Sequence, residues 1–227
     1  MKLISDIRIY KSNSDNVDGA SLPAGFADKK LNAVIRRIVM KLRENDFSLG
    51  EFTHLYINLT TCSVDGNISP AKRSVDRYNP WYRYYDVNIS GELFAKLGVC
   101  EVTDEIAGII CDVLVKFFLY DRFDKDLICS CISEAVNKGE KMCVKFKEKQ
   151  AAKSKAEVFL FFTDSCRYLP LLRVSDAEGR IIFEEYLPES IDLNCIGEIC
   201  LSSKKVTVKP RKNAFTEGIE PISFDLK

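Results

Sequence analysis

The fold is decided by residues 124–147, DKDLICSCISEAVNKGEKMCVKFK, because the spacing of the hydrophobic residues changes within this stretch. Up to Val136 the hydrophobic residues recur every three or four positions, which is the spacing of one helix face. Asp124 is a suitable N-cap for this helix, and Gly139 suits its C-terminal cap. From Met142 onward the pattern is typical of strands. The sequence therefore predicts that the helices end near residue 140 and that strands follow.

Before this change the sequence predicts strands and two further helices. The first helix begins after Asp28 and keeps hydrophobic residues at helical spacing as far as Leu42. The second begins at Thr103, a candidate N-cap, and continues to Phe118. The strands are expected at residues 6–10, 52–60 and 86–89. The second of these alternates in the manner of a half-buried strand, with Leu55, Ile57 and Leu59 on one face and His54, Tyr56 and Asn58 on the other.

After the change six strands are expected, at residues 142–147, 157–163, 171–174, 180–186, 196–201 and 206–209. Gly179 can adopt positive φ in the hairpin between the third and the fourth. The run from Val158 to Phe162 lacks alternation, which predicts a strand covered on both faces. Residues 147–155 are polar and indicate a flexible loop or a joint between domains.

This order of elements predicts an α+β fold. A strict alternation of strand and helix is absent, which argues against a doubly wound parallel sheet. We expect a mixed or antiparallel sheet packed with three main helices in residues 1–140, followed by a mostly antiparallel β meander in residues 141–227. One continuous domain remains an alternative.

Composition excludes several classes of protein. The 33 basic and 33 acidic residues cancel, so no overall field attracts nucleic acid or an anionic membrane. No hydrophobic run has the length of a signal peptide or a membrane span, which predicts a cytoplasmic protein. The nine cysteines are an odd number and are expected to be mostly reduced and buried. No metal site and no cofactor are expected, because ligand spacing and phosphate-binding glycine motifs are absent.

Two features could carry chemistry. His54 is the only histidine, so it is the only side chain with an unperturbed pKa near neutrality. It could serve a small hydrolase with a cysteine or a carboxylate as its partner, although a surface or hydrogen-bonding role is the commoner one. The helix after Asp28 has a basic side that indicates either a solvated outer face or a surface that binds phosphate or an anionic membrane. It consists of Lys29, Lys30, Arg36, Arg37, Lys41 and Arg43.

The segment from Tyr78 to Tyr85 has five aromatic residues among eight. Tyrosine, tryptophan and arginine together are typical of protein-binding hot spots. With Arg83 the same rings could stack on the bases of single-stranded nucleic acid. The third interpretation is a loop whose aromatic rings cover the core.

Four stretches together resemble a family of bacterial immunity proteins from polymorphic-toxin and contact-dependent inhibition loci. They are Ile7–Tyr10, Leu22–Asp28, His54–Leu59 and Trp81–Val87. The resemblance covers about the first 120 residues. It implies a non-catalytic, cytoplasmic protein that binds the C-terminal domain of one cognate toxin and blocks its active site or its access to substrate.

On this hypothesis no nucleic acid, membrane or cofactor is a partner, and the candidate toxin-binding residues are Trp81, Tyr82, Arg83, Tyr84, Tyr85 and Asp86. The neutral charge of the chain means that any acidic, nucleic-acid-like surface could only be local. The alternatives are the hydrolase using His54 and a nucleic-acid-binding module that uses the basic helix side with Arg83.

Overall fold

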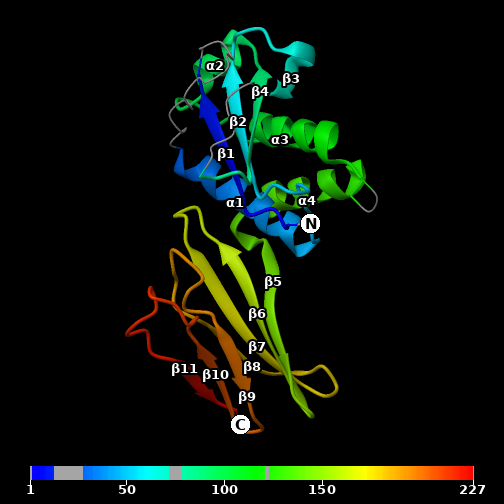
Figure 1. Cartoon of the computed structure of the whole chain (residues 1–227). Coiled ribbons are helices and arrows are strands. Elements are labelled where there is room, and N and C mark those ends of the chain that lie inside the picture. The colour runs from blue at the N-terminus through cyan, green and yellow to red at the C-terminus, as the bar shows by residue number, and fades with distance from the viewer. Residues whose placement is uncertain (1, 13–27, 72–77, 121–122, 227) are drawn as a thin grey trace. The chain divides into compact units, whose positions relative to one another are not determined.

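A computed structural model describes residues 2–12, 28–71, 78–120 and 123–226. The chain divides into two compact units, Met1–Gly139 and Glu140–Lys227, next to the boundary predicted after residue 140. The first contains a mixed sheet and helices, and the second contains antiparallel sheets (Figure 1). The predicted α+β class is therefore confirmed. The part of the resembling stretch Leu22–Asp28 that precedes Asp28 lies outside the described residues.

The first unit is built on a four-stranded sheet of order β1-β2-β4-β3. β1 pairs with β2 and β2 pairs with β4 in parallel, whereas β3 is antiparallel to β4. The strands are β1 (Asp6–Lys11), β2 (His54–Thr60), β3 (Ile68–Pro70) and β4 (Tyr82–Asn88), and the helices are α1 (Lys29–Glu44), α2 (Gly91–Lys96), α3 (Thr103–Phe118) and α4 (Lys125–Lys138). The short helix α2 was not predicted. β1 and β2 are parallel because the long connection through α1 brings the chain back in the same direction, and the antiparallel strand β3 makes the sheet mixed.

The helix starts follow the predicted capping chemistry in two cases of three. The side chain of Asp28 accepts a hydrogen bond from the backbone N–H of Leu31 at 3.0 Å. Asp124 does the same for Leu127 at 2.8 Å. The prediction for Thr103 is wrong, because this residue is the first of α3 and no side chain caps the helix.

Both faces of the central strand β2 are buried, so the prediction of a half-buried strand is wrong. Leu55, Ile57 and Leu59 are fully buried on one face, as the alternation predicted. Tyr56 and Asn58 on the other face are only 3% exposed. β2 lies between β1 and β4, and sequence alternation alone does not show that the polar face is also covered.

The basic side of α1 is a solvated face only in part. Lys29, Lys30 and Arg43 are exposed, whereas Arg36 and Lys41 are half-buried and Arg37 is buried. Arg37 is 2% exposed, because α1 packs against β1 on one side and α4 on another. Arg36 donates a hydrogen bond to the carbonyl of Ser5 at 3.0 Å, and Arg43 donates one to the carbonyl of Ile4 at 2.8 Å. These cations therefore fasten the helix to the chain that leads into β1.

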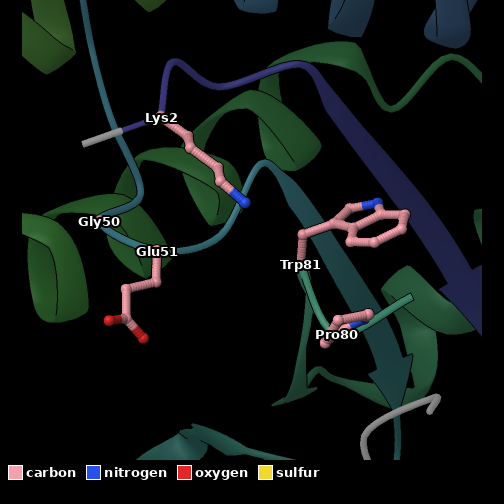
Figure 2. Close-up of a pocket in the computed structure, with 5 residues that line it drawn as sticks. All are labelled: Lys2, Gly50, Glu51, Pro80 and Trp81. Carbon is pink, nitrogen blue, oxygen red and sulfur yellow. The ribbon is translucent and has the colours of Figure 1, made fainter. Parts of the chain in front are cut away.

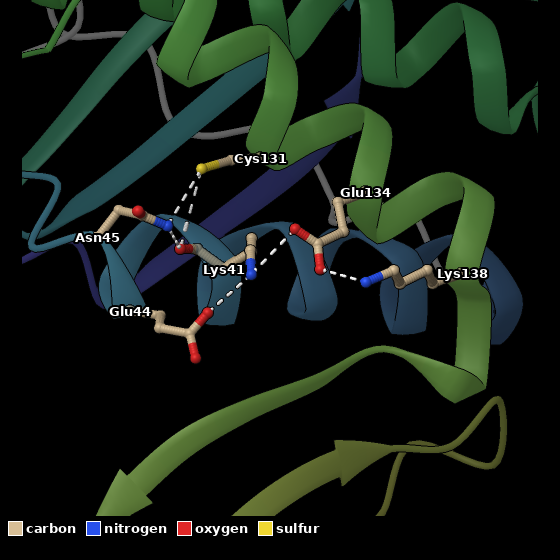
Figure 3. Close-up of polar contacts among 6 residues, drawn as sticks. All are labelled: Lys41, Glu44, Asn45, Cys131, Glu134 and Lys138. Atoms are coloured by element: carbon tan, nitrogen blue, oxygen red, sulfur yellow. Dashed lines mark hydrogen bonds and ion pairs between the residues drawn. The ribbon is translucent and has the colours of Figure 1, made fainter.

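Lys41 links α1 to α4 through two carboxylates. Its Nζ lies 2.8 Å from Glu44 and 2.9 Å from Glu134, which also pairs with Lys138 at 2.8 Å (Figure 3). Burial alone would lower the pKa of Lys41, but its hydrogen bonds to the two glutamates outweigh burial and raise it. The hydrogen bonds from Lys138 and then from Lys41 lower the pKa of Glu134.

Replacing Glu134 by glutamine is expected to reduce the free energy of unfolding by about 1 kcal/mol at pH 7. A carboxyl group with a lowered pKa in the folded state stabilises that state above its unfolded pKa, and the contribution is lost as the pH falls through the folded value. The difference between wild type and variant should therefore be full above the ordinary glutamate pKa of 4.5 and vanish in stronger acid. Urea denaturation at several pH values measures it.

The matched control is Glu92→Gln in α2, which removes a single and more exposed pair with Lys96. Its effect at pH 7 should be smaller than that of Glu134→Gln. Equal effects of the two substitutions would contradict a special role for the link between α1 and α4.

The second unit contains two antiparallel sheets, β5-β6-β7-β8 and β11-β10-β9. The strands are β5 (Cys143–Gln150), β6 (Ser154–Phe162), β7 (Tyr168–Asp176), β8 (Ile181–Tyr186), β9 (Glu198–Leu201), β10 (Lys205–Lys209) and β11 (Ile222–Asp225). The rings of Phe183 and Phe224 lie 5.0 Å apart, and Lys147 donates a hydrogen bond to the carbonyl of Gly197. These contacts join the two sheets face to face, as in a sandwich.

Two expectations for this unit were wrong and one is confirmed. Residues 147–155 are not a flexible loop, because β5 and β6 extend into a tight hairpin closed by the bond from Ala151 N–H to the Ser154 carbonyl at 2.9 Å. β6 alternates between buried and half-buried residues, so it is not covered equally on both faces. The hairpin before β8 is as predicted, with Gly179 at φ +81°. β11 was not predicted.

All nine cysteines are free thiols in the structure, in line with the expected reduced state. Their burial differs from the prediction. Cys131 is buried, whereas Cys100 and Cys143 are exposed and the other six are half-buried. The thiols of Cys111 in α3 and Cys129 in α4 lie 3.1 Å apart, so two of the nine contact each other across the helix pair.

Candidate functional site

A surface hollow of about 630 Å³ lies where the parallel strands of the first unit begin. Because β1, β2 and β4 run in the same direction, the segments that precede them meet at one edge of the sheet. These segments supply the lining residues Lys2, Gly50, Glu51, Pro80 and Trp81, which surround the hollow in Figure 2. The hollow is therefore a product of parallel pairing.

The backbone around the hollow is held by hydrogen bonds between the three segments. The N–H of Lys2 donates to the carbonyl of Gly50 at 3.1 Å, and the N–H of Thr53 donates to the carbonyl of Trp81 at 2.9 Å. Gly50 has φ +77°, a conformation that side chains with a Cβ rarely adopt. The bond from Thr53 therefore fixes the main chain at Trp81.

A row of aromatic rings leads from the hollow into the core. The ring of Tyr82 lies 6.0 Å from Trp81, 4.6 Å from His54 and 4.9 Å from Tyr56. Tyr56 in turn lies 5.2 Å from Tyr84, which is 7% exposed. Two of these pairs, Trp81–Tyr82 and Tyr56–Tyr84, are edge-to-face and the other two are tilted, and ring contacts at these distances are stabilising. The half-buried Trp81 and Tyr82 therefore rest on a packed aromatic support.

The six candidate toxin-binding residues divide into two groups. Trp81, Tyr82 and Arg83 are half-buried and can touch a partner. The other three, Tyr84, Tyr85 and Asp86, are no more than 7% exposed and belong to the core. The segment therefore combines two of the interpretations made from sequence, because its first half reaches the surface and its second half fills the sheet.

Arg83 is directed toward aromatic rings of its own unit. Its guanidinium carbon lies 5.3 Å from the ring centre of Phe52 and 6.0 Å from that of Tyr85. Burial raises the pKa of Tyr85, and the hydrogen bond and charge of Arg83 partly oppose that shift. On the same face Tyr85 packs 4.6 Å from Phe117 of α3. Arg83 thus packs against rings of its own unit next to Trp81. Stacking on nucleic-acid bases would require the guanidinium to leave these rings.

His54 lies at the start of β2 beside Asp6 of β1 and Tyr82 of β4. Its Nδ1 is 2.8 Å from the hydroxyl of Thr53. Burial lowers the pKa of His54, the charge of Asp6 opposes this, and the charges of Arg8 and Arg36 add to it. The imidazole is therefore neutral at pH 7, and it is not among the residues that line the hollow.

The polar neighbours of His54 are engaged with one another. Asp6 accepts a hydrogen bond from Arg8 at 2.7 Å, and the Arg8 guanidinium lies 5.5 Å from the ring centre of Tyr56. Burial and then the hydrogen bond with Tyr82 raise the pKa of Tyr56. In the described ranges no thiol or carboxylate is found in a hydrogen bond with His54. The hydrolase hypothesis would need such a group.

Most of the lining of the hollow could not be predicted from the sequence. Lys2, Gly50 and Glu51 carry no local signal, because they come together with Trp81 only through the parallel order β1-β2-β4. The sequence also does not show which aromatic side chains of the segment are exposed, such as Tyr78, which is 88% exposed. The visible sequence signal was the aromatic composition alone.

Neither metals nor membranes are indicated by the described residues. No group of three or more histidine, cysteine, aspartate or glutamate side chains among them could hold a metal ion. No helix within residues 2–12, 28–71, 78–120 and 123–226 is both long and apolar enough to cross a bilayer. Comparisons of the chain with protein-family models, with curated proteins and with solved structures give no match.

Proposed function

We propose that the protein neutralises a cognate bacterial toxin by binding the toxin's C-terminal domain through the surface around Trp81. The proposal covers Trp81, Tyr82 and Arg83 with the hollow formed by Lys2 and Glu51. The observation that carries it is the half-buried Trp81, set at the rim of a hollow and supported by a packed row of rings. Rigid aromatic side chains of this kind bind with little loss of conformational entropy.

The lining of the hollow adds specificity to the apolar contact. Lys2 and Glu51 provide one cation and one anion beside the indole, and Pro80 provides a rigid apolar edge. A partner that fills this surface needs an apolar group against Trp81 and polar groups of both signs around it. Binding there would block the toxin if its active site or its substrate path lies against this surface.

Replacing Trp81 by alanine is expected to raise the dissociation constant for the toxin domain encoded by the adjacent gene by about 30-fold or more. The reason is loss of a large buried anchor at the centre of the interface. Tyr82→Ala should also raise the dissociation constant, but by a smaller factor, because Tyr82 lies deeper in the row of rings. Calorimetric titration of the purified pair measures both changes.

The matched control is Phe215→Ala, which removes an aromatic side chain that is 83% exposed in the second unit. It should leave toxin affinity unchanged. Tyr84 is unsuitable as a test because its burial would confuse loss of contact with loss of folding. Equal affinity of wild type and Trp81→Ala for the toxin domain would show that this surface does not bind the toxin. Failure of the wild type to protect cells from the toxin encoded by the adjacent gene would reject the proposed function itself.

A further inference from the structure

The outer edge of β8 in the second unit is unpaired. β8 is the last strand of the order β5-β6-β7-β8, and no backbone bond found in the described part of the chain uses its outer side. The N–H of Leu187 donates to the carbonyl of Pro170 at 2.8 Å. Since hydrogen-bonded and non-bonded pairs alternate along antiparallel strands, the backbone groups of Glu184 and Tyr186 point away from β7. They can pair with another strand.

The side chains of β8 are unusually exposed for a strand of this composition. Ile181 is 55% exposed, Ile182 is 44% exposed and Tyr186 is 52% exposed. The ring of Tyr186 lies 6.1 Å from Phe161 of β6, so the apolar surface continues onto the sheet. Exposed edges with apolar side chains are sites of strand addition, and proteins often protect them by charges and bulges.

The charges around β8 are strongly acidic. Residues 176–192 contain six carboxylates and one arginine, namely Asp176, Glu178, Glu184, Glu185, Glu189, Asp192 and Arg180. Arg180 pairs with Asp176 and Glu178, and Glu184 pairs with Arg173 of β7. Glu185 and Glu189 form no ion pair with any residue that the structure describes. The edge therefore has uncompensated negative charge beside its apolar groups.

We propose that this edge takes up an extended, cationic and apolar segment of a partner protein as an additional strand. The backbone of Glu184 and Tyr186 would supply the hydrogen bonds, and Ile182 and Tyr186 would contact apolar side chains. Lysine or arginine side chains of the segment would lie near Glu185 and Glu189. Such binding uses main-chain bonds for affinity and alternating side chains for specificity.

A second copy of the chain fits this edge less well. Antiparallel pairing of two β8 strands in a register centred on Glu184 or Glu185 would set two carboxylates directly opposite each other, which is destabilising. In these two registers a segment with basic side chains opposite Glu184 or Glu185 fits the edge better than a second copy does. The inference does not rest on the surface around Trp81, which belongs to the other unit.

The test uses two fluorescently labelled nine-residue peptides, one alternating valine and lysine and one alternating valine and glutamate. Fluorescence anisotropy with the full chain should show binding of the lysine peptide at least about ten-fold tighter than that of the glutamate peptide. Charge reversal by Glu185→Lys with Glu189→Lys should abolish this preference. Trp81→Ala should leave it unchanged, which separates the inference from the proposed function.

A matched pair of variants isolates the backbone contribution. Glu184→Ala and Glu184→Pro both remove the carboxylate, but only proline also removes the outward N–H. Binding of the lysine peptide should therefore fall at least about ten-fold more with proline than with alanine. No preference between the peptides, or preference that survives the charge reversal, would overturn the proposal. A dimer in sedimentation experiments that Glu184→Pro disrupts would also overturn it by identifying a second copy as the occupant.

Discussion

Replacing Asp86 by leucine is expected to lower the free energy of unfolding of the first unit by about 1–3 kcal/mol. Asp86 is 1% exposed in β4 and accepts a hydrogen bond from the amide of Asn58 in β2 at 2.8 Å. The substitution leaves a buried amide without this acceptor between two central strands. Urea denaturation followed by Trp81 fluorescence measures the change, because Trp81 is the only tryptophan and reports the first unit.

The control for this prediction is a double-mutant cycle. Asn58→Leu alone should also be destabilising, because it removes the hydrogen bond that the Asn58 amide donates to the buried Asp86 carboxylate. The double variant should lose less stability than the sum of the two single losses, since residues in one hydrogen-bonded pair are not additive. Strict additivity would mean that the bond between the two side chains contributes nothing.

Replacing Gly197 by alanine is expected to destabilise the second unit by about 3 kcal/mol. A Cβ at this position would overlap the backbone carbonyl of Pro210 and the backbone nitrogen of Arg211. Backbone atoms cannot rotate away as a side chain can, so the strands β9 and β10 would have to separate locally. Thermal unfolding followed by far-ultraviolet circular dichroism measures the loss.

Gly108→Ala is the matched control for Gly197→Ala. Gly108 lies in α3, where an added Cβ meets no atom within 4 Å. Alanine is the better helix former, so this variant should be more stable by about 0.5–1 kcal/mol. A loss of stability at Gly108, or none at Gly197, would contradict the packing described for each site.

The sequence predicted the elements whose pattern is local. The hydrophobic spacing of α1, α3 and α4 and the capping residues Asp28 and Asp124 act within a few positions, so these helices could be located without the structure. The hairpin at Gly179 is local in the same sense. The short helix α2 and the strand β11 are too brief to give a period that stands out from their surroundings.

The candidate site could be predicted only in part. The aromatic composition around Trp81 was visible in the sequence, but exposure was not, because it depends on which strands flank β4. The buried state of Arg37 was missed for the same reason, since a charged residue on a helix is usually solvated. The meeting of Lys2 and Glu51 beside Trp81 follows from parallel pairing, for which no local signal exists.

The parallel pairing of β1 with β2 and of β2 with β4 has a consequence for how the chain folds. Each of these pairs joins segments separated by a long connection, and β1 cannot meet β2 until the chain through α1 has closed. The strands from β5 to β8 instead pair with their immediate successors through short turns. Because closing longer loops costs more entropy before any contact is gained, folding of the first unit should be the slower kinetic phase. The half synthesised first on the ribosome would then be the half that becomes native last.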